Sequence, residues 1–374
     1  MAKIAINTRY LLKDKLEGFG WYSYEVARRL AENHPKHQFY FFFDRPFDPN
    51  FVFSKNITPI VLGPPARHPI LHYIWNEWSV RKALKKYSID VYFSPDGYLS
   101  LKTKTKQLIT IHDINFEHYP EDLPLSARKY YRFFFPKFAI KSDKILTVSN
   151  FSKSDIIQHY GISDSKIRAI WNGVSEKFVQ ISEEVKVKIK HKYSYGQDYF
   201  IFVGSLNPRK NLRRLVAAYE LYASNKEHPW HLVIVGEKMW RNQTEHLSIS
   251  TSIESQIHFT GRLNDEELSK AVAAAGAMTF VPYFEGFGIP MVEAMRCGVP
   301  VLAGNLSSLP EIGQDAVLYC DPFDTKSIAE GLEQISNDSL LRQKLTSKGL
   351  ERSKAFSWDK CAEAVWEEIE KLLQ

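Results

Sequence analysis

Residues 282–293 read Pro-Tyr-Phe-Glu-Gly-Phe-Gly-Ile-Pro-Met-Val-Glu and place two glutamates eight positions apart around a glycine-rich turn. The apolar run at 277–281 before them predicts a buried strand, and Pro290 suits the first turn of a following helix. A helix N-terminus presents unpaired N–H groups and a partial positive charge, which suit a diphosphate. Glu285 in the loop and Glu293 about two turns along the helix are placed to accept hydrogen bonds from sugar and ribose hydroxyls. The stretch therefore predicts a sugar-nucleotide site.

The composition is that of a globular protein with two domains. The chain has 374 residues, of which 44% are hydrophobic and 25% charged, and this length suits two domains at about 150 residues each. No run of about 18 apolar residues is present to span a bilayer. The opening residues 1–9 have too short an apolar run for a signal peptide and predict a first strand. We therefore expect a cytoplasmic protein.

The cysteines predict neither a disulfide framework nor a zinc site. Cys297, Cys320 and Cys361 are odd in number and have no C-x-x-C spacing. We expect three buried, inert thiols.

Charge is unevenly distributed along the chain. Residues 1–175 carry 26 Lys and Arg against 16 Asp and Glu, or +10, and the remainder carries 23 against 27, or −4. A basic first half suggests an anionic partner, either a membrane surface or nucleic acid. Since no recognisable nucleic-acid-binding motif is present, we expect no nucleic-acid partner.

A basic aromatic helix predicted at 125–141 is the feature that favours a membrane surface. Much of it must be core, but its cations lie among aromatic residues and suit an anionic membrane, where a lipid-linked acceptor would be found. A solvated surface is the alternative, and Trp75 and Trp78 beside four nearby cations carry the same ambiguity. The cations of the predicted helix are Arg128, Lys129, Arg132, Lys137 and Lys141.

Strands and helices alternate along both halves, which predicts parallel sheets joined by helical crossovers. Helices are expected at 21–33, 125–141, 212–224 and 358–373, and Asn264 begins another with a capping-box spacing to Glu267. The charged segment 181–198 interrupts the pattern and predicts a hinge. The predicted strands are 4–7, 40–43, 91–94, 107–111 and 145–148 in the first half, and 200–203, 231–235, 257–259, 278–281 and 299–303 in the second.

These features together resemble glycosyltransferase family 4, whose members are retaining enzymes with the GT-B fold. The resemblance runs along almost the whole chain, and the E-x7-E spacing of Glu285 and Glu293 is the most informative part of it. The other matching segments are Gly18-Phe19-Gly20, Ile111-His112-Asp113, 147–152, Asn172-Gly173-Val174, 204–212, Val235-Gly236-Glu237, 259–262 and Leu309-Pro310-Glu311-Ile312.

The resemblance implies two doubly wound Rossmann-like domains facing across a cleft. We expect an acceptor-side domain at 1–180, the hinge at 181–198, and a nucleotide-sugar-binding domain at 199–355. A C-terminal helix at 356–374 is expected to cross back to the first domain.

Four catalytic residues are predicted. Arg209 and Lys210 follow a strand and a Gly204-Ser205 turn, where two cations suit the diphosphate leaving group. The family often has an arginine at the position of Ser205, so the part of Arg209 in stabilising the leaving group is less well defined than that of Lys210. By resemblance His112 and Glu285 contact the transferred sugar.

The same resemblance assigns the donor-binding residues. Glu293 accepts from the ribose, Phe287 and Gly288 offer N–H groups, and the first glycine-rich turn closes over the phosphates. An ordinary tight turn is the alternative for the latter. The donor-binding residues are Gly18, Phe19, Gly20, Gly204, Gly236, Arg262, Leu263, Gly286, Phe287, Gly288, Ile289 and Glu293.

The resemblance implies transfer of a hexose with retention, by front-face displacement at a site without metal or other cofactor. The absence of a D-x-D run agrees with this. The first glycine-rich turn and the Asn-Pro-Arg-Lys-Asn pattern most resemble those of bacterial polysaccharide mannosyltransferases. This resemblance favours GDP-mannose as donor and a glycan or lipid-linked saccharide as acceptor. We also expect peripheral contact with the inner face of the membrane.

Three alternatives stay open at this point. A nicotinamide dehydrogenase would need a G-x-G-x-x-G after the first strand, which is absent. A GT-B epimerase would work on the nucleotide sugar without an acceptor. A non-catalytic sugar-binding member would not need Lys210, Glu285 and Glu293 together.

Overall fold

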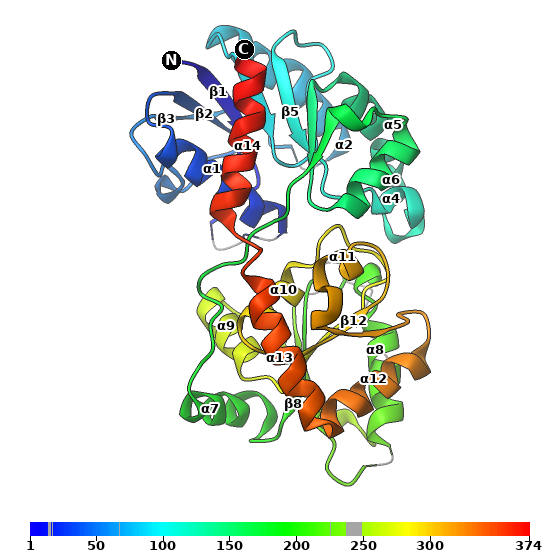
Figure 1. Cartoon of the computed structure of the whole chain (residues 1–374). Helices are drawn as coiled ribbons and strands as arrows, with labels where there is room; N and C mark the ends of the chain where they lie inside the picture. The colour runs from blue at the N-terminus through cyan, green and yellow to red at the C-terminus, as the bar shows by residue number, and fades with distance from the viewer. Residues whose placement is uncertain (14–15, 17, 67, 225, 237–248) are drawn as a thin grey trace. The chain divides into compact units, whose positions relative to one another are not determined.

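The structure, a computed structural model, describes all residues except 14–15, 17, 67, 225 and 237–248. The chain divides into two compact units (Figure 1). The N-terminal unit comprises residues 1–173 and 357–374, and the C-terminal unit comprises residues 174–356. Each unit is built around one parallel sheet.

The N-terminal unit has a seven-stranded sheet in the order β3-β2-β1-β4-β5-β6-β7. Most residues of its strands are buried because helices cover the sheet, as in Phe39–Phe43, where every residue but Tyr40 is buried. The strands are β1 (Lys3–Asn7), β2 (Gln38–Phe43), β3 (Ile57–Val61), β4 (Val91–Ser94), β5 (Lys106–Thr110), β6 (Lys144–Thr147) and β7 (Ile167–Ala169).

Seven α-helices and one π-helical segment belong to the described part of this unit, besides short 3₁₀ turns. Helix α14 packs against α1 over the sheet and buries Trp358, Val365 and Ile369 in the same core (Figure 1). The helices are α1 (Gly18–Asn33), α2 (Pro69–Ile74), α3 (Arg81–Lys86), α4 (Asn115–His118), α5 (Leu125–Lys141), α6 (Asn150–Tyr160) and α14 (Trp358–Leu373), and the π-helical segment is Trp75–Val80.

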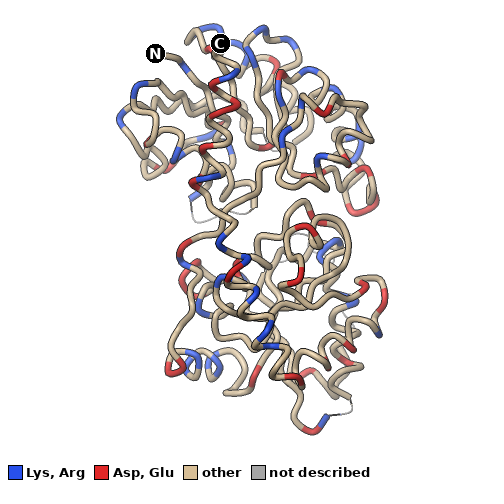
Figure 2. Tube along the Cα trace, in the orientation of Figure 1, with Lys and Arg blue, Asp and Glu red and all other residues tan. Residues whose placement is uncertain are grey.

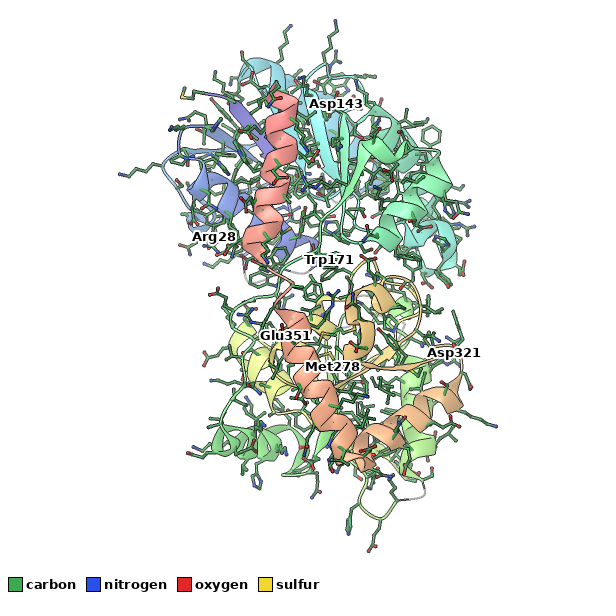
Figure 3. All side chains as sticks on the ribbon, in the orientation of Figure 1. Arg28, Asp143, Trp171, Met278, Asp321 and Glu351 are labelled. Atoms are coloured by element: carbon green, nitrogen blue, oxygen red, sulfur yellow. The ribbon has the colours of Figure 1, made fainter. Side chains whose placement is uncertain are left out.

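The C-terminal unit has a six-stranded sheet in the order β10-β9-β8-β11-β12-β13. Met278 on β11, labelled in Figure 3, is fully buried in it. The strands are β8 (Tyr199–Val203), β9 (His231–Val235), β10 (Ile257–Gly261), β11 (Ala277–Phe280), β12 (Val301–Gly304) and β13 (Leu318–Cys320). The helices are α7 (Glu183–Ser194), α8 (Leu212–Ala223), α9 (Asp265–Ala273), α10 (Ile289–Arg296), α11 (Leu309–Gly313), α12 (Thr325–Asn337) and α13 (Ser339–Ser353).

The prediction of two parallel Rossmann-like sheets is confirmed. Helices α5 and α14 have the predicted bounds, and the side chain of Asn264 accepts from the N–H of Glu267 at 2.9 Å to cap α9. The three cysteines are buried, and burial raises the pKa of each thiol to about 12.

The predicted hinge at 181–198 is instead largely helix α7, which packs against α9 within the C-terminal unit. The many charged residues of this segment suggested a flexible hinge. In the structure they form ion pairs along the helix, as Lys186 does with Glu183 and Lys188 with Glu184. Lys192 then binds Glu267 at 2.6 Å. The chain passes between the units at Gly173–Val174 and returns at Phe356–Ser357.

The predicted turn at Gly18, Phe19 and Gly20 forms the start of α1. The space at Gly20 is tight, since a Cβ there would lie 3.0 Å from the backbone oxygen of Tyr10 and 3.2 Å from Leu16.

Charge divides less sharply between the units than between the halves of the sequence. The acidic helix α14 belongs to the N-terminal unit, which therefore has 28 Lys and Arg against 21 Asp and Glu, or +7, while the C-terminal unit has 21 against 22, or −1. Figure 2 shows cations and carboxylates interspersed over both units. In the described part of the chain, no helix combines the length and the apolar character needed to cross a bilayer.

Candidate functional site

The E-x7-E stretch lies at the carboxyl end of β11, in the loop that leads into α10. Gly288 caps the helix with φ 97°, a conformation that favours glycine, and a Cβ there would also lie 2.9 Å from Leu309. Pro290 occupies the first turn of α10, as predicted. The backbone therefore turns directly from the strand into a helix N-terminus, where Gly286, Phe287 and Ile289 also lie.

Glu285 is the centre of a buried ion cluster. One carboxylate oxygen, Oε1, accepts from Nη1 of Arg209 at 2.9 Å and from Nζ of Lys210 at 2.5 Å. Glu285 and Lys210 are only 7% and 9% exposed. The structure therefore brings together three of the four predicted catalytic residues.

The two cations are held by a short turn between β8 and α8. Asn207 caps a single 3₁₀ turn at Pro208–Lys210, and Asn211 ends that turn with φ 63°. The amide of Asn211 donates to the backbone oxygens of Val281 and Pro322, and the N–H of Tyr283 donates to the oxygen of Arg209 at 3.1 Å. The turn is thus tied to the loop that carries Glu285.

The ion cluster keeps Glu285 charged. Burial by itself would raise its pKa, but the positive charges of Arg209 and Lys210 outweigh burial and hold the pKa of Glu285 below its ordinary value. At neutral pH the cluster therefore contains two cations and one carboxylate.

Two serines that we did not predict position Glu285. The N–H of Glu285 donates to Oγ of Ser307 at 3.0 Å, and Oγ of Ser308 donates to the backbone oxygen of Glu285 at 2.9 Å. Both serines directly precede Leu309–Ile312, a segment that resembles the family. Their positions in the sequence, more than twenty residues after Glu285, give no sign that they contact it.

Glu293 differs sharply from Glu285 although both belong to one motif. It lies beyond the first turn of α10, half-buried, and no basic side chain of the described residues forms an ion pair with it. Burial raises the pKa of Glu293 to about 8, with a smaller contribution from the negative charge of Asp265. Burial thus favours the neutral carboxyl form of Glu293 at neutral pH, and its predicted contact with the ribose stays a prediction.

The remaining predicted residues of this unit surround the same end of the sheet. A Cβ at Gly236 would lie 1.9 Å from the backbone oxygen of Gly204, so these two backbones can approach only because Gly236 has no side chain. Arg262 is exposed and Leu263 half-buried in the segment from β10 to α9. Glu237, part of a matching segment, lies outside the described residues.

His112 and Phe19 come together in the N-terminal unit. The ring of His112, just after β5, lies 4.7 Å from the rings of Phe19 and Tyr22. Its Nε2 lies 2.8 Å from the backbone oxygen of Pro95, and because a carbonyl only accepts, Nε2 carries the proton and Nδ1 is the acceptor. Burial lowers the pKa of His112, so the ring is neutral at pH 7.

A buried ion pair that we did not predict lies at the same end of this sheet. Nε of Arg9 donates to Asp96 at 2.7 Å, and Asp96 also accepts from Asn7 and Ser94. The guanidinium lies 4.1 Å from the ring centre of Tyr98. Asp96 directly follows Pro95, so this network fixes the carbonyl that orients His112.

Comparison with known proteins gives consistent matches. The family described as "Glycosyltransferase Family 4" matches residues 16–178, and the one described as "Glycosyl transferases group 1" matches residues 185–352. The chain is 30% identical over 362 residues to O-antigen chain mannosyltransferase B of Escherichia coli, which covers 94% of this chain and 95% of that protein.

Two solved structures share the fold. Sucrose-phosphate synthase from Thermosynechococcus elongatus has a TM-score of 0.81 at 19% identity, covering 100% of this chain and 99% of that one. Anabaena Alr3699/HepE in complex with UDP-glucose has a TM-score of 0.75 at 16% identity, covering 99% and 100%. Both likenesses support the GT-B fold.

Proposed function

The chain belongs to glycosyltransferase family 4 and is a glycosyltransferase, and from this premise we propose that it transfers mannose from GDP-mannose to a glycan or lipid-linked saccharide. We propose that the configuration at the anomeric carbon is retained and that no metal takes part. The observation that carries this chemistry is the bonding of Glu285 to both Arg209 and Lys210 beside the N-terminus of α10.

The cations suit a diphosphate leaving group. When the bond from the anomeric carbon to the phosphate oxygen breaks, its electron pair stays on the diphosphate, whose negative charge grows in the transition state. Arg209, Lys210 and the N–H groups of the helix N-terminus stabilise that growing charge. Both cations bond Oε1 of Glu285, and in this proposal Oε2 accepts from a hydroxyl of the sugar.

The roles assigned to the two glutamates favour front-face displacement. A double displacement needs a carboxylate nucleophile at the anomeric carbon, but in this proposal Oε2 of Glu285 accepts from a sugar hydroxyl and Glu293 binds the ribose. In the proposed step the acceptor oxygen bonds the anomeric carbon while the bond to phosphate breaks. The acceptor proton passes to an oxygen of the leaving phosphate.

We assign His112 to the transferred sugar. The ring is neutral and its Nε2 is held by Pro95, so Nδ1 can accept from a sugar hydroxyl. Phe19, which is 45% exposed and adjacent to the ring, is assigned to the cover over the donor with Gly18 and Gly20.

The identity of the sugar rests on the relatives. The mannosyltransferase from Escherichia coli matches along nearly the whole chain, which supports mannose. UDP-glucose, bound in the Anabaena protein, is the competing donor.

Helix α5 supports a lipid-linked acceptor at an anionic membrane. Leu125, Phe133 and Ile140 on this helix are 70%, 57% and 64% exposed. Lys129 and Lys137 lie four residues before and after Phe133, so cations and apolar groups share one helix face. We propose that this face contacts the cytoplasmic side of the membrane.

The test is a donor screen followed by a transfer assay on the full-length protein. A nucleotide sugar at about 100 times its Kd should stabilise the fold by about 2.7 kcal/mol in a thermal-shift measurement. GDP-mannose should do so more than UDP-glucose, and it should donate mannose only when acceptor is present. Stabilisation by UDP-glucose alone would reject the donor, and conversion of donor without acceptor would indicate an epimerase. An inverted linkage in the product, read by NMR, would reject retention.

A further inference from the structure

Two histidines and an aspartate that have no assigned part in sugar transfer come together in the N-terminal unit. His118 ends α4, while Asp155 and His159 lie four residues apart on one face of α6. Nε2 of His118 lies 2.8 Å from Oδ1 of Asp155, and Nδ1 of His159 lies 3.2 Å from the same oxygen. All three candidate ligand atoms lie within 4.8 Å of one another.

The cluster combines a fixed carboxylate with accessible rings. The side chain of Asp155 is 9% exposed, and those of His118 and His159 are 31% and 36% exposed. The neighbouring carboxylate of Glu117 is already bound by Arg132 at 2.9 Å and by the hydroxyl of Tyr160 at 3.1 Å. Asp155 therefore faces two imidazoles that are both partly exposed to solvent.

We propose that His118, Asp155 and His159 form a binding site for a divalent transition-metal ion, with Zn²⁺ as the representative ion. Imidazole nitrogen and carboxylate oxygen are the ligands that Zn²⁺ accepts, at distances of about 2.0–2.2 Å. Ligand atoms at those distances on a tetrahedral ion are roughly 3.4 Å apart. The two imidazole nitrogens lie 2.8 and 3.2 Å from Oδ1 of Asp155, and all three ligand atoms lie within 4.8 Å of one another, so small side-chain shifts would admit the ion. Water occupies the fourth position.

The ion would join α4 to α6. Helix α4 begins at Asn115, three residues after His112, so a metal held by His118 restrains the segment that follows the sugar-contacting histidine. The ion's role is to hold this segment, whereas the proposed function assigns the diphosphate to Arg209 and Lys210.

The experiment is titration of metal-depleted, full-length protein with ZnCl₂ by isothermal calorimetry. We expect one ion per chain at the highest-affinity site. His159→Gln and His118→Gln should each weaken it by at least about tenfold, since loss of even an indirect partner of a ligand costs that much. His228→Gln is the matched control, because that side chain is 85% exposed and distant in sequence, and it should bind as the parent does.

Co²⁺ provides a second measurement that does not depend on variant stability. Bound by two imidazoles, a carboxylate and water, it should give the visible absorption of a four-coordinate ion, which added Zn²⁺ removes. If the protein takes up no ion, or if both cluster variants bind as tightly as the parent, the three residues are ion pairs only and the proposal is wrong.

Discussion

Replacing Glu293 by glutamine should stabilise the ligand-free protein, and the gain should grow from pH 5 to pH 8. The reason is that the folded protein holds a proton on Glu293 up to a pKa of about 8, whereas the unfolded chain releases it near 4.5. Between these values the folded state binds more protons than the unfolded state, so stability falls as pH rises. Glutamine has no proton to lose and removes this dependence.

The magnitude follows from the two pKa values. Each pKa unit corresponds to about 1.36 kcal/mol, so the interval from 4.5 to about 8 sets a ceiling of roughly 5 kcal/mol. Glu293 is half-buried, and water screens part of the effect, so we expect roughly 1–3 kcal/mol between pH 5 and pH 8. Most of the change should come between pH 5 and pH 7.5.

The assay is denaturant unfolding of parent and variant in half-unit pH steps, with the midpoint compared at each pH. Glu285→Gln is the matched control in the same motif. Because the pKa of Glu285 is lowered, its stabilising contribution is complete above the ordinary pKa and is lost only as pH falls below it. The cost of Glu285→Gln should therefore stay constant from pH 5 to pH 8. A constant difference for Glu293→Gln as well would refute the reasoning.

Four further outcomes are expected. Lys210→Ala should lower kcat by about 10²–10³-fold with little change in donor affinity, because leaving-group charge grows only in the transition state; unchanged kinetics in a folded variant would remove Lys210 from the mechanism. Sugar transfer should survive excess EDTA in the parent protein. The same assay on His159→Gln separates any effect of the proposed α4–α6 metal site. A loss of transfer in parent and variant alike that Mg²⁺ restores would show that the donor needs a metal. Donor affinity, measured by calorimetry, should fall as pH rises through about 8, since an ionised Glu293 repels the diphosphate. The affinity of Glu293→Gln should depend less on pH, and the same pH dependence in both proteins would contradict this. Cosedimentation with anionic vesicles should weaken in Lys129→Glu/Lys137→Glu and fall with salt, as the Debye length shrinks from about 10 Å at 0.1 M to about 3 Å at 1 M, while equal recovery with neutral vesicles would leave α5 a solvated surface.

Hydrophobic pattern predicts every central strand of the two sheets but only one of the four edge strands, β10. The ten predicted strands are present, and the three that we missed, β3, β7 and β13, are all edge strands. Strand β3 contains Pro59, which a central strand excludes and an edge strand tolerates, and the other two have three residues each. An edge strand has one hydrogen-bonded neighbour and needs less apolar sequence, so its signal is weak.

The parts of the site that could be predicted are those whose residues lie close together in the sequence. Glu285 and Glu293 are eight residues apart, and Arg209 and Lys210 are adjacent, so the sequence contains both pairs. Contacts made across the fold, such as Glu285 with Ser307, join residues whose proximity depends on how β11 and β12 pair. No local pattern records such a contact.

The protonation states of the two glutamates of the E-x7-E motif could not be predicted from the sequence either. Glu285 and Glu293 look alike in the printed sequence, yet one is held charged by two cations and the other is held neutral by burial. A neutral carboxyl can donate to one ribose hydroxyl and accept from the other, and it adds no charge to repel the diphosphate between them. A carboxylate at both positions would place two negative charges at the ends of an already anionic ligand, with Arg209 and Lys210 to balance them. The spacing of the two glutamates can therefore be read from the sequence, whereas their different charge states depend on what surrounds each side chain in the fold.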